Sequence, residues 1–248
     1  MKVAEHIEAL DAAGRSLADA AAEAGPDAEV ATCPGWRVRD LLRHTTMVHR
    51  WATTFVAEGH TSYHPDGGEP DLDGDALVAH YRAGHADLVA ALRAAPADLE
   101  CWTFLPAPSP LAFWARRQAH ETTVHRADAE SASLEGRPGP VDPIVAVDGI
   151  DELLRGFHAR DRSRVRTPEP RTLRVRTTDT DDVWTTHLSQ GAPRTERTTD
   201  GPADCELSGP AGRLYLTLWN RLPDSAVSVT GDASLARLWR ENSGITWS

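Results

Sequence analysis

The chain has 248 residues and a formal net charge of −11, from 26 basic and 37 acidic side chains. This length allows one large domain or two smaller ones. The acidic balance argues against nucleic acid or an anionic membrane as a partner, because both need a basic patch. Lys2 is the only lysine, so chemistry that needs a Schiff-base lysine, such as pyridoxal phosphate catalysis, is nearly excluded.

Signals for export, membrane insertion and nucleotide binding are also missing. No run of about 18 apolar residues occurs, so no membrane span is expected. The first ten residues carry acids where a signal peptide is apolar, which favours a cytoplasmic location. Cys33, Cys101 and Cys205 form no Cys-x-x-Cys pair and fit a reduced compartment. Neither a glycine-rich phosphate loop nor a Gly-x-Ser-x-Gly turn is present.

The first 160 residues predict helices, because apolar residues recur there at helical spacing. Two connecting segments are expected to be irregular: residues 60–74, rich in Gly, Pro, Asp and His, and residues 96–110, interrupted by prolines. The expected helices cover residues 3–25, 36–58, 77–92, 111–131 and 144–158.

After residue 160 the pattern changes. Residues 167–170 suggest a linker, and Leu173 and Val175 then alternate with arginines, as in a half-buried strand. Mixed strands and helices in about 80 residues predict a small α+β domain. We therefore expect a helical domain over residues 1–160 and a separate, smaller α+β domain over residues 168–248. Its expected strands lie at 173–175, 183–188, 194–199, 203–207 and 226–230, and its helices at 212–221 and 232–241.

Two of the predicted helices carry residues of metal-ligand type on their inward faces. On one helix, His44 lies in an apolar stripe with Leu41 and Val48. On another, Glu121 and His125 are four residues apart and share a face, because a helix advances about 100° per residue. Two histidines and one carboxylate leave coordination positions open, as catalytic sites for zinc and other divalent metals do.

Spacing also excludes a related metal motif. The histidines of His120-Glu-Thr-Thr-Val-His125 are five residues apart, which places them about 140° apart around the helix. The His-Glu-x-x-His motif of metalloproteases needs a spacing of four. We therefore do not expect His120 to be a ligand.

Each candidate also has a purely structural interpretation. A histidine in an apolar stripe is often a hydrogen-bonded core residue, and Glu/His pairs four apart are common on solvated helices. Cys33 is better explained as a small buried residue than as a reactive thiol. Asp128 is a candidate to orient His125, but a surface ion pair with Arg126 or another arginine is the more common arrangement. A glutamate that faces the core nevertheless needs a partner, and a cation would provide one.

Two sequence motifs carry a family resemblance. Residues 33–44 read Cys-Pro-Gly-Trp-x-x-x-Asp-Leu-x-x-His, and residues 116–130 read Arg-Arg-x-x-His-Glu-x-x-x-His-Arg-x-Asp-Ala-Glu. Together they resemble the mycothiol-dependent maleylpyruvate isomerase family. The resemblance implies a DinB-like four-helix bundle and, from weaker motifs, a sterol-carrier-like C-terminal α+β domain. By motif position it also implies that His44, Glu121 and His125 hold a zinc ion.

The resemblance implies the chemistry as well. A thiol bound to a divalent metal loses its proton and becomes a nucleophilic thiolate near neutral pH. The resemblance implies that mycothiol is used in this way against a small electrophile. An adduct that later expels the thiol gives isomerisation, and an adduct that keeps it gives S-transfer. We therefore expect an enzyme that needs a divalent metal, zinc in the first place, and a low-molecular-weight thiol.

The substrate side of the site is less defined. Pockets prefer domain interfaces, so we expect the mouth of the site between the two domains. Arg221, near the end of a predicted helix, is the residue expected to orient an anionic electrophile, although it could instead bind carbonyls at its own helix end. Arg116 and Arg117 could bind a substrate carboxylate, but arginines on helix surfaces are usually solvated. The tryptophans that could line the pocket, at least two of them expected in the core, are Trp36, Trp51, Trp102 and Trp114.

Two other functions stay open. The first is a ligand-binding protein whose metal site is vestigial or structural. The second is a metal-dependent hydrolase, which would need a separate general base, with His49 and His85 as the candidates.

Overall fold

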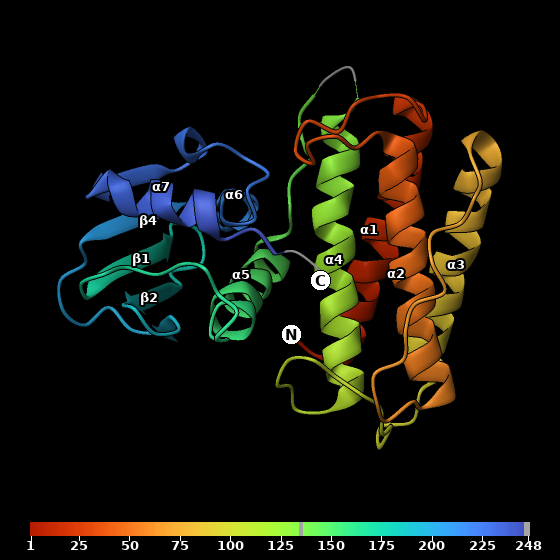
Figure 1. The fold of residues 1–248 in the computed structure, drawn as a ribbon, viewed down its shortest axis with the longest axis horizontal. Coiled ribbons are helices and arrows are strands. Elements are labelled where there is room, and N and C mark those ends of the chain that lie inside the picture. The colour runs from red at the N-terminus through yellow and green to blue at the C-terminus, as the bar shows by residue number, and fades with distance from the viewer. Residues whose placement is uncertain (134–135, 246–248) are drawn as a thin grey trace. The chain divides into compact units, whose positions relative to one another are not determined.

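The computed structural model describes residues 1–133 and 136–245, and the chain divides into two compact units, Met1–Gly139 and Pro140–Ser248. The described residues of the first unit form a bundle of four long helices, and those of the second form a smaller α+β domain (Figure 1). The predicted fold class is confirmed. The first compact unit ends at Gly139, earlier than the residue 160 expected from the sequence. The change of hydrophobic period shows where the strands begin, whereas helix α5 (Pro143–Asp151) before them already packs with the second unit.

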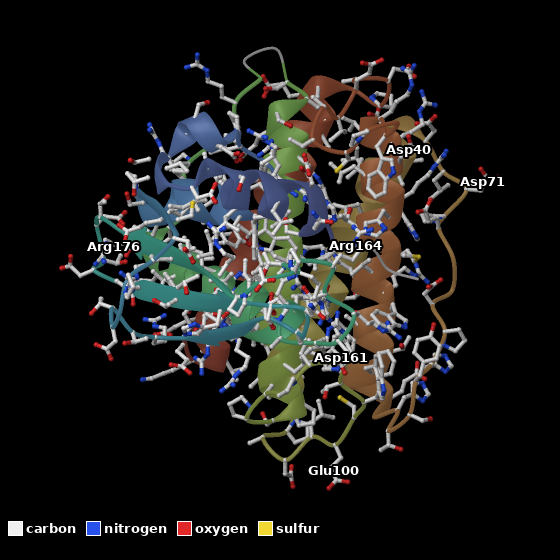
Figure 2. All side chains as sticks on the ribbon, turned by 60° about the vertical axis from the view of Figure 1, so that its left-hand side comes forward. Asp40, Asp71, Glu100, Asp161, Arg164 and Arg176 are labelled. Atoms are coloured by element: carbon white, nitrogen blue, oxygen red, sulfur yellow. The ribbon has the colours of Figure 1, made fainter. Side chains whose placement is uncertain are left out.

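The helices of the bundle are α1 (Val3–Ala24), α2 (Val38–Glu58), α3 (Gly74–Ala94) and α4 (Pro110–Ser131). Both α1 and α2 pack against α3 and α4. Acidic side chains such as Asp71 and Glu100 project from the segments that connect these helices (Figure 2). No helix among the described residues is long and apolar enough to cross a membrane. Fully buried side chains at the centre of the bundle include Leu10, Leu17, Leu41, Leu77 and Tyr81.

Local signals in the sequence set the ends of these helices. The Asp73 carboxylate accepts a hydrogen bond from Gly74 N at the start of α3, and the Ser109 hydroxyl accepts one from Ala112 N at the start of α4. Helix α2 ends at Gly59, whose φ of 68° is left-handed. Capping residues of these types explain why the boundaries lie within a few residues of those predicted.

Helix α4 differs from its neighbours because it is both polar and buried. Burying polar side chains is costly unless they bind one another or a ligand. Helix α4 is therefore the part of the bundle where a functional site is most expected. Its buried polar residues are Arg117, Gln118, His120, Glu121, Thr122, Thr123, His125 and Asp128.

The α+β domain begins with α5 (Pro143–Asp151), which continues into a π-helical turn, η1 (Glu152–Phe157). Its described strands form a sheet in the order β3-β2-β1-β4-β5, in which β1 and β4 are parallel and the other neighbours are antiparallel. The strands are β1 (Arg171–Thr177), β2 (Val183–Leu188), β3 (Arg194–Glu196), β4 (Cys205–Gly209) and β5 (Ser228–Gly231). The remaining elements are α6 (Ala211–Leu218), a 3-10 turn η2 (Asp224–Ala226) and α7 (Ala233–Asn242).

Strand β1 follows its predicted alternation only in part. Leu173 and Val175 are buried as expected. Arg174 between them is buried too, because its guanidinium donates hydrogen bonds to the main-chain carbonyls of Asp200 and Gly201. The half-buried pattern expected from the sequence is therefore wrong at Arg174, which ties the segment before β4 to the sheet.

Gly14 on α1 gives room to the His85 ring on α3. A Cβ added at Gly14 would lie 2.2 Å from His85 Cε1, and both residues are buried. We expect Gly14→Ala to lower the free energy of unfolding by about 1–3 kcal/mol in urea titrations, as overpacking does. In a His85→Ala background the same change should stabilise by up to about 1 kcal/mol, because alanine is the better helix former. An effect of the same sign in both backgrounds would contradict this account.

Candidate metal centre

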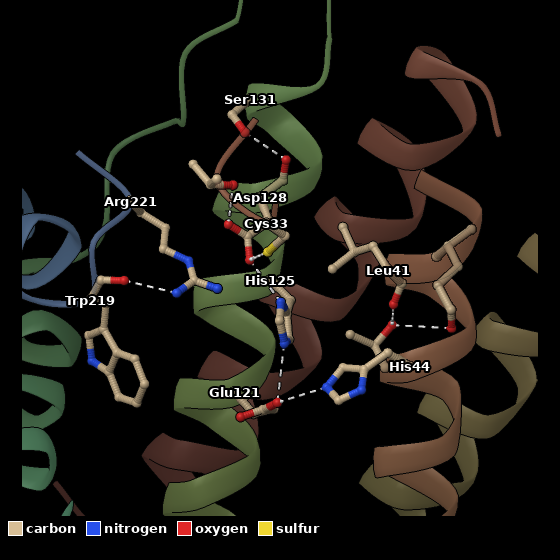
Figure 3. A network of polar contacts seen from close by, with 12 residues as sticks. Cys33, Leu41, His44, Glu121, His125, Asp128, Ser131, Trp219 and Arg221 are labelled. Carbon is tan, nitrogen blue, oxygen red and sulfur yellow. Dashed lines mark hydrogen bonds and ion pairs between the residues drawn. The ribbon is translucent and has the colours of Figure 1, made fainter. Parts of the chain in front are cut away.

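His44 of α2 meets Glu121 and His125 of α4 inside the bundle (Figure 3). Glu121 Oε1 lies 3.5 Å from His44 Nε2 and 3.2 Å from His125 Nε2. One potential ligand atom from each residue lies within 4.8 Å of the other two. The side chains of His44, Glu121 and His125 are 14%, 9% and 9% exposed. The structure thus brings together the three residues that the sequence predicts as ligands.

The helices explain this convergence. Glu121 and His125 are one turn apart on α4, and α2 packs against α4, so His44 reaches the same point from the neighbouring helix. The rings of His44 and His125 are 5.2 Å apart and nearly perpendicular. His120 lies elsewhere on α4, with its ring 6.0 Å from that of His6. The structure thus places His120 outside the group formed by His44, Glu121 and His125.

The second ring nitrogen of His125 is held by a buried carboxylate. His125 Nδ1 lies 2.8 Å from Asp128 Oδ2, and Asp128 is fully buried. The expectation of a surface ion pair between Asp128 and Arg126 is therefore wrong, and Arg126 Nε lies 3.4 Å from Glu130 Oε1. When the Nδ1–H of a histidine ring donates to a carboxylate, the Nε2 atom points away from that carboxylate. The Nε2 atom of His125 therefore points toward Glu121.

Arg117 occupies the other side of Glu121. It is buried, contrary to its expected place on a solvated helix surface, and its Nη2 donates to Glu121 Oε2 at 3.2 Å. The two oxygens of Glu121 therefore have different partners: Oε2 faces the guanidinium, and Oε1 faces the two candidate ligand rings of His44 and His125.

The electrostatics of this group favour a cation. Burial opposes ionisation of Glu121, but hydrogen bonds from His125 and His44 and the charge of Arg117 hold its pKa well below the usual range. Burial also disfavours the charged form of His125, yet hydrogen bonds with Asp128 and Glu121 raise its pKa to about 9. Two carboxylates thus surround one buried ring, and such an environment stabilises positive charge.

Of the four tryptophans considered for the pocket, Trp36 lies against the candidate ligands. Its ring is 5.1 Å from the His44 ring and stacks on the His125 ring at 6.3 Å, and it is only partly buried. The other three pack on one another: Trp51 contacts Trp102 at 6.1 Å and Trp114 at 5.4 Å. Of these three only Trp114 is fully buried, and Trp51 and Trp102 are partly buried. The core thus contains one of the four tryptophans, fewer than the two expected.

One residue of this network escaped the sequence analysis. The Thr32 hydroxyl donates to Asp128 Oδ1 at 2.5 Å, and the neighbouring Cys33 Sγ lies 3.5 Å from Asp128 Oδ2. Thr32 and Asp128 are 96 positions apart, so no periodic pattern could connect them. Cys33 is partly buried, which leaves its thiol at the edge of the network.

Two family models match the chain. One, described as the mycothiol maleylpyruvate isomerase N-terminal domain, matches residues 7–130, and the other, the MDMPI C-terminal domain, matches residues 145–238. The chain belongs to the mycothiol-dependent maleylpyruvate isomerase family. No curated protein matched it in sequence.

Two solved structures resemble this family member over most of its length. Crystal structures of the mycothiol-dependent maleylpyruvate isomerase and of a point mutant of it match with TM-scores of 0.64 and 0.65. Sequence identity is 12% and 13%, and each match covers 93% of both chains. At this identity the similarity establishes the shared fold.

In this maleylpyruvate isomerase family member, Arg221 lies just after α6. Its Nη1 donates to Trp219 O at 2.8 Å, and its backbone N donates to Leu216 O at 2.7 Å (Figure 3). These bonds fit the interpretation that Arg221 binds carbonyls at its own helix end. A role in orienting substrate stays a prediction.

His49 and His85 lie in the same bundle as the candidate ligands. His49 Nε2 is 2.9 Å from Thr122 Oγ1, and burial lowers the pKa of His49 to about 3. His85 Nε2 is 3.4 Å from Asp11 O, and burial lowers its pKa as well. A general base works best with a pKa near the operating pH, so His49, with a pKa of about 3, is not suited to that role.

The buried His49 makes the metal-free protein sensitive to acid. Its pKa is about 6.5 when the chain is unfolded and about 3 when it is folded, so the unfolded state binds more protons between these values. Stability should therefore fall as the pH is lowered from about 6.5 toward 3. We expect His49→Gln, which keeps a polar partner for Thr122, to flatten this dependence in urea titrations at several pH values. Equal slopes for the variant and the parent would contradict it, since His125, with a pKa of about 6.5 in the unfolded chain and about 9 in the folded one, is protonated in both states over this range.

Proposed function

We propose that this protein is a divalent-metal-dependent S-transferase or isomerase that uses a low-molecular-weight thiol, mycothiol, against a small electrophile. The observation that carries the proposal is the convergence of His44 Nε2, Glu121 Oε1 and His125 Nε2 in one buried group. Family membership supports mycothiol as the thiol and isomerisation as one outcome.

The residues present fit a zinc ion. Two imidazole nitrogens and one carboxylate oxygen are the ligands of open catalytic zinc sites, in which a fourth position remains for substrate. Ligand atoms about 2.0–2.2 Å from a shared tetrahedral ion lie about 3.3–3.6 Å from one another. The separations of 3.5 Å and 3.2 Å from Glu121 Oε1 are close to that range. When bound, such an ion lowers the pKa of a thiol and so makes the thiolate available near neutral pH.

The chain itself supplies orientation and charge balance. Asp128 holds the His125 ring, and Arg117 offsets part of the negative charge of Glu121. Less negative charge then remains on the ligand set, which favours an anionic sulfur there over a neutral one. Trp36, stacked on His125 and partly buried, forms an apolar wall against which a small electrophile can pack.

The two outcomes differ in the fate of one bond. The thiolate sulfur adds to an electrophilic carbon of a double bond that is activated by a carbonyl group. A C–S bond forms, the π bond breaks, and its electron pair moves onto the carbonyl oxygen as an enolate. If that C–S bond breaks again after rotation about the former double bond, the product is an isomer and the thiol is regenerated. If the adduct instead takes up a proton and keeps the C–S bond, the product is a thioether.

The hydrolase alternative is weaker, because burial lowers the pKa of both candidate bases, His49 and His85. A ligand-binding protein with a structural metal remains the competing function, and it predicts no turnover with any electrophile.

Metal content is the first test. We expect about one zinc or other divalent ion per chain, measured by elemental analysis of purified protein. Alanine at His44, Glu121 or His125 should remove most of the metal, because three ligands are the minimum for such a site. His120→Ala is the matched control on the same helix and should retain the metal. Full metal content in the three ligand variants would refute the proposed centre.

Turnover is the second test. We expect the metal-loaded protein to convert at least one member of a panel of small electrophiles only when mycothiol is present. Chelation should abolish the activity and added zinc should restore it. Turnover without any thiol would favour a hydrolase, and binding without turnover would favour the ligand-binding alternative.

Arg221 tests the substrate side of the proposal. If its guanidinium orients an anionic electrophile, Arg221→Ala should lower kcat/KM at least about tenfold, the loss of one charged contact of about 1.4 kcal/mol. Metal content and melting temperature should stay near the parent values. Activity that is unchanged, or that falls only in step with stability, would show that Arg221 serves its own helix end.

A further inference from the structure

The segment before α2 is a closely hydrogen-bonded turn. Cys33 N donates to Val30 O at 2.9 Å, Trp36 N donates to Cys33 O at 2.9 Å, and Val30 N donates to Trp36 O at 3.0 Å. Pro34 and Gly35 are the central residues of the second bend, and Gly35 has a φ of +86°. Proline followed by a residue with positive φ is the pattern of a type II turn. These hydrogen bonds define the backbone of the turn from residue 30 to residue 36.

This turn presents two side chains to Asp128. Thr32 Oγ1 donates to Asp128 Oδ1 at 2.5 Å, and Cys33 Sγ lies 3.5 Å from Asp128 Oδ2. The same Oδ2 lies 2.8 Å from His125 Nδ1. Both oxygens of this fully buried carboxylate thus have partners in the turn, and one of them is shared with His125 (Figure 3).

We propose that the turn of residues 30–36 is a positioning device for His125, with Thr32 as its principal residue. Thr32 fixes the Asp128 carboxylate, Asp128 fixes the His125 ring, and the ring then directs Nε2 toward Glu121 and His44. Thr32 touches no reacting atom, so it is a positioning residue. The inference rests on the proposed function, because metal affinity is what this orientation serves.

A competing explanation comes from the same residues. Ligand atoms of Cys33, His125 and Asp128 also lie within 4.8 Å of one another and could hold an ion themselves. In that arrangement the ion would take the place of the hydrogen bond between His125 and Asp128. A second ion per chain that is lost in Cys33→Ala would overturn the positioning proposal.

The hydroxyl of Thr32 provides the main test, by competition for zinc with a chromogenic chelator. Thr32→Val keeps the shape and removes the donor, and it should weaken zinc binding about tenfold or more, as loss of a partner behind a ligand histidine does. Thr32→Ser keeps the donor and should restore the parent affinity. The matched control is Thr53→Val, whose hydroxyl donates to His49 O at 2.8 Å outside this network, and it should leave the affinity unchanged. Equal losses in Thr32→Val and Thr53→Val would overturn the proposal.

The backbone of the turn provides a second test. A Cβ added at Gly35 or at Gly68 would meet no atom within 4 Å, and the φ values are +86° and +77°. Alanine at either position therefore introduces similar backbone strain without a steric clash. Only Gly35→Ala lies in the positioning turn, so only it should weaken zinc binding. Equal affinities in Gly35→Ala and Gly68→Ala would show that the turn does not set the site.

A measurement on metal-free protein separates this inference from the proposed function. In the parent and in Thr32→Ser, NMR should show a His125 Nδ1–H proton that is protected from exchange with solvent by its bond to Asp128. In Thr32→Val that protection should be lost while the circular dichroism spectrum is retained. If the parent binds no metal but the protection still depends on Thr32, the proposed function fails and the positioning role stands. If Thr32→Val leaves the protection unchanged, the positioning role fails whatever the metal content.

Discussion

The arrangement of this bundle depends on one constraint, the burial of the Glu121 carboxylate. A charge taken out of water must be compensated by partners, and each of its oxygens has one. Arg117 takes Oε2, and the rings of His44 and His125 face Oε1. Helix α4 can therefore be polar and buried at once, which an amphipathic helix with one solvated face would avoid.

The residues that bind Glu121 are themselves bound by further polar residues. His125 is shared between Glu121 and Asp128, and Asp128 is in turn held by Thr32 and Cys33. The chain of contacts thus connects the middle of α4 with the turn that precedes α2. Buried polar networks of this kind define one arrangement of their members, because each unmade bond leaves a desolvated group. The position of a ligand is then a property of the network and not of one helix.

The sequence predicted those parts of this arrangement that are local. His44, Glu121 and His125 follow from helical spacing, and the helix ends follow from capping residues such as Ser109. The bond from Thr32 to Asp128 was not predictable, because it joins segments 96 residues apart without any shared period. The burial of Arg174 was not predictable for a similar reason. Alternation assigns a residue to one face of a strand, but carbonyls from a distant segment decide whether an arginine can be buried on that face.

Burial alone does not decide what a histidine in this bundle can do. His49 and His125 are both buried, and desolvation disfavours the charged form of each. The nearest polar partner of His49 is the Thr122 hydroxyl, and its pKa falls to about 3. His125 lies between two carboxylates, and its pKa rises to about 9. In the same low-polarity interior, the His49 ring is therefore neutral, whereas the His125 ring is stabilised in its positively charged form. The difference comes from the two carboxylates of α4 beside His125.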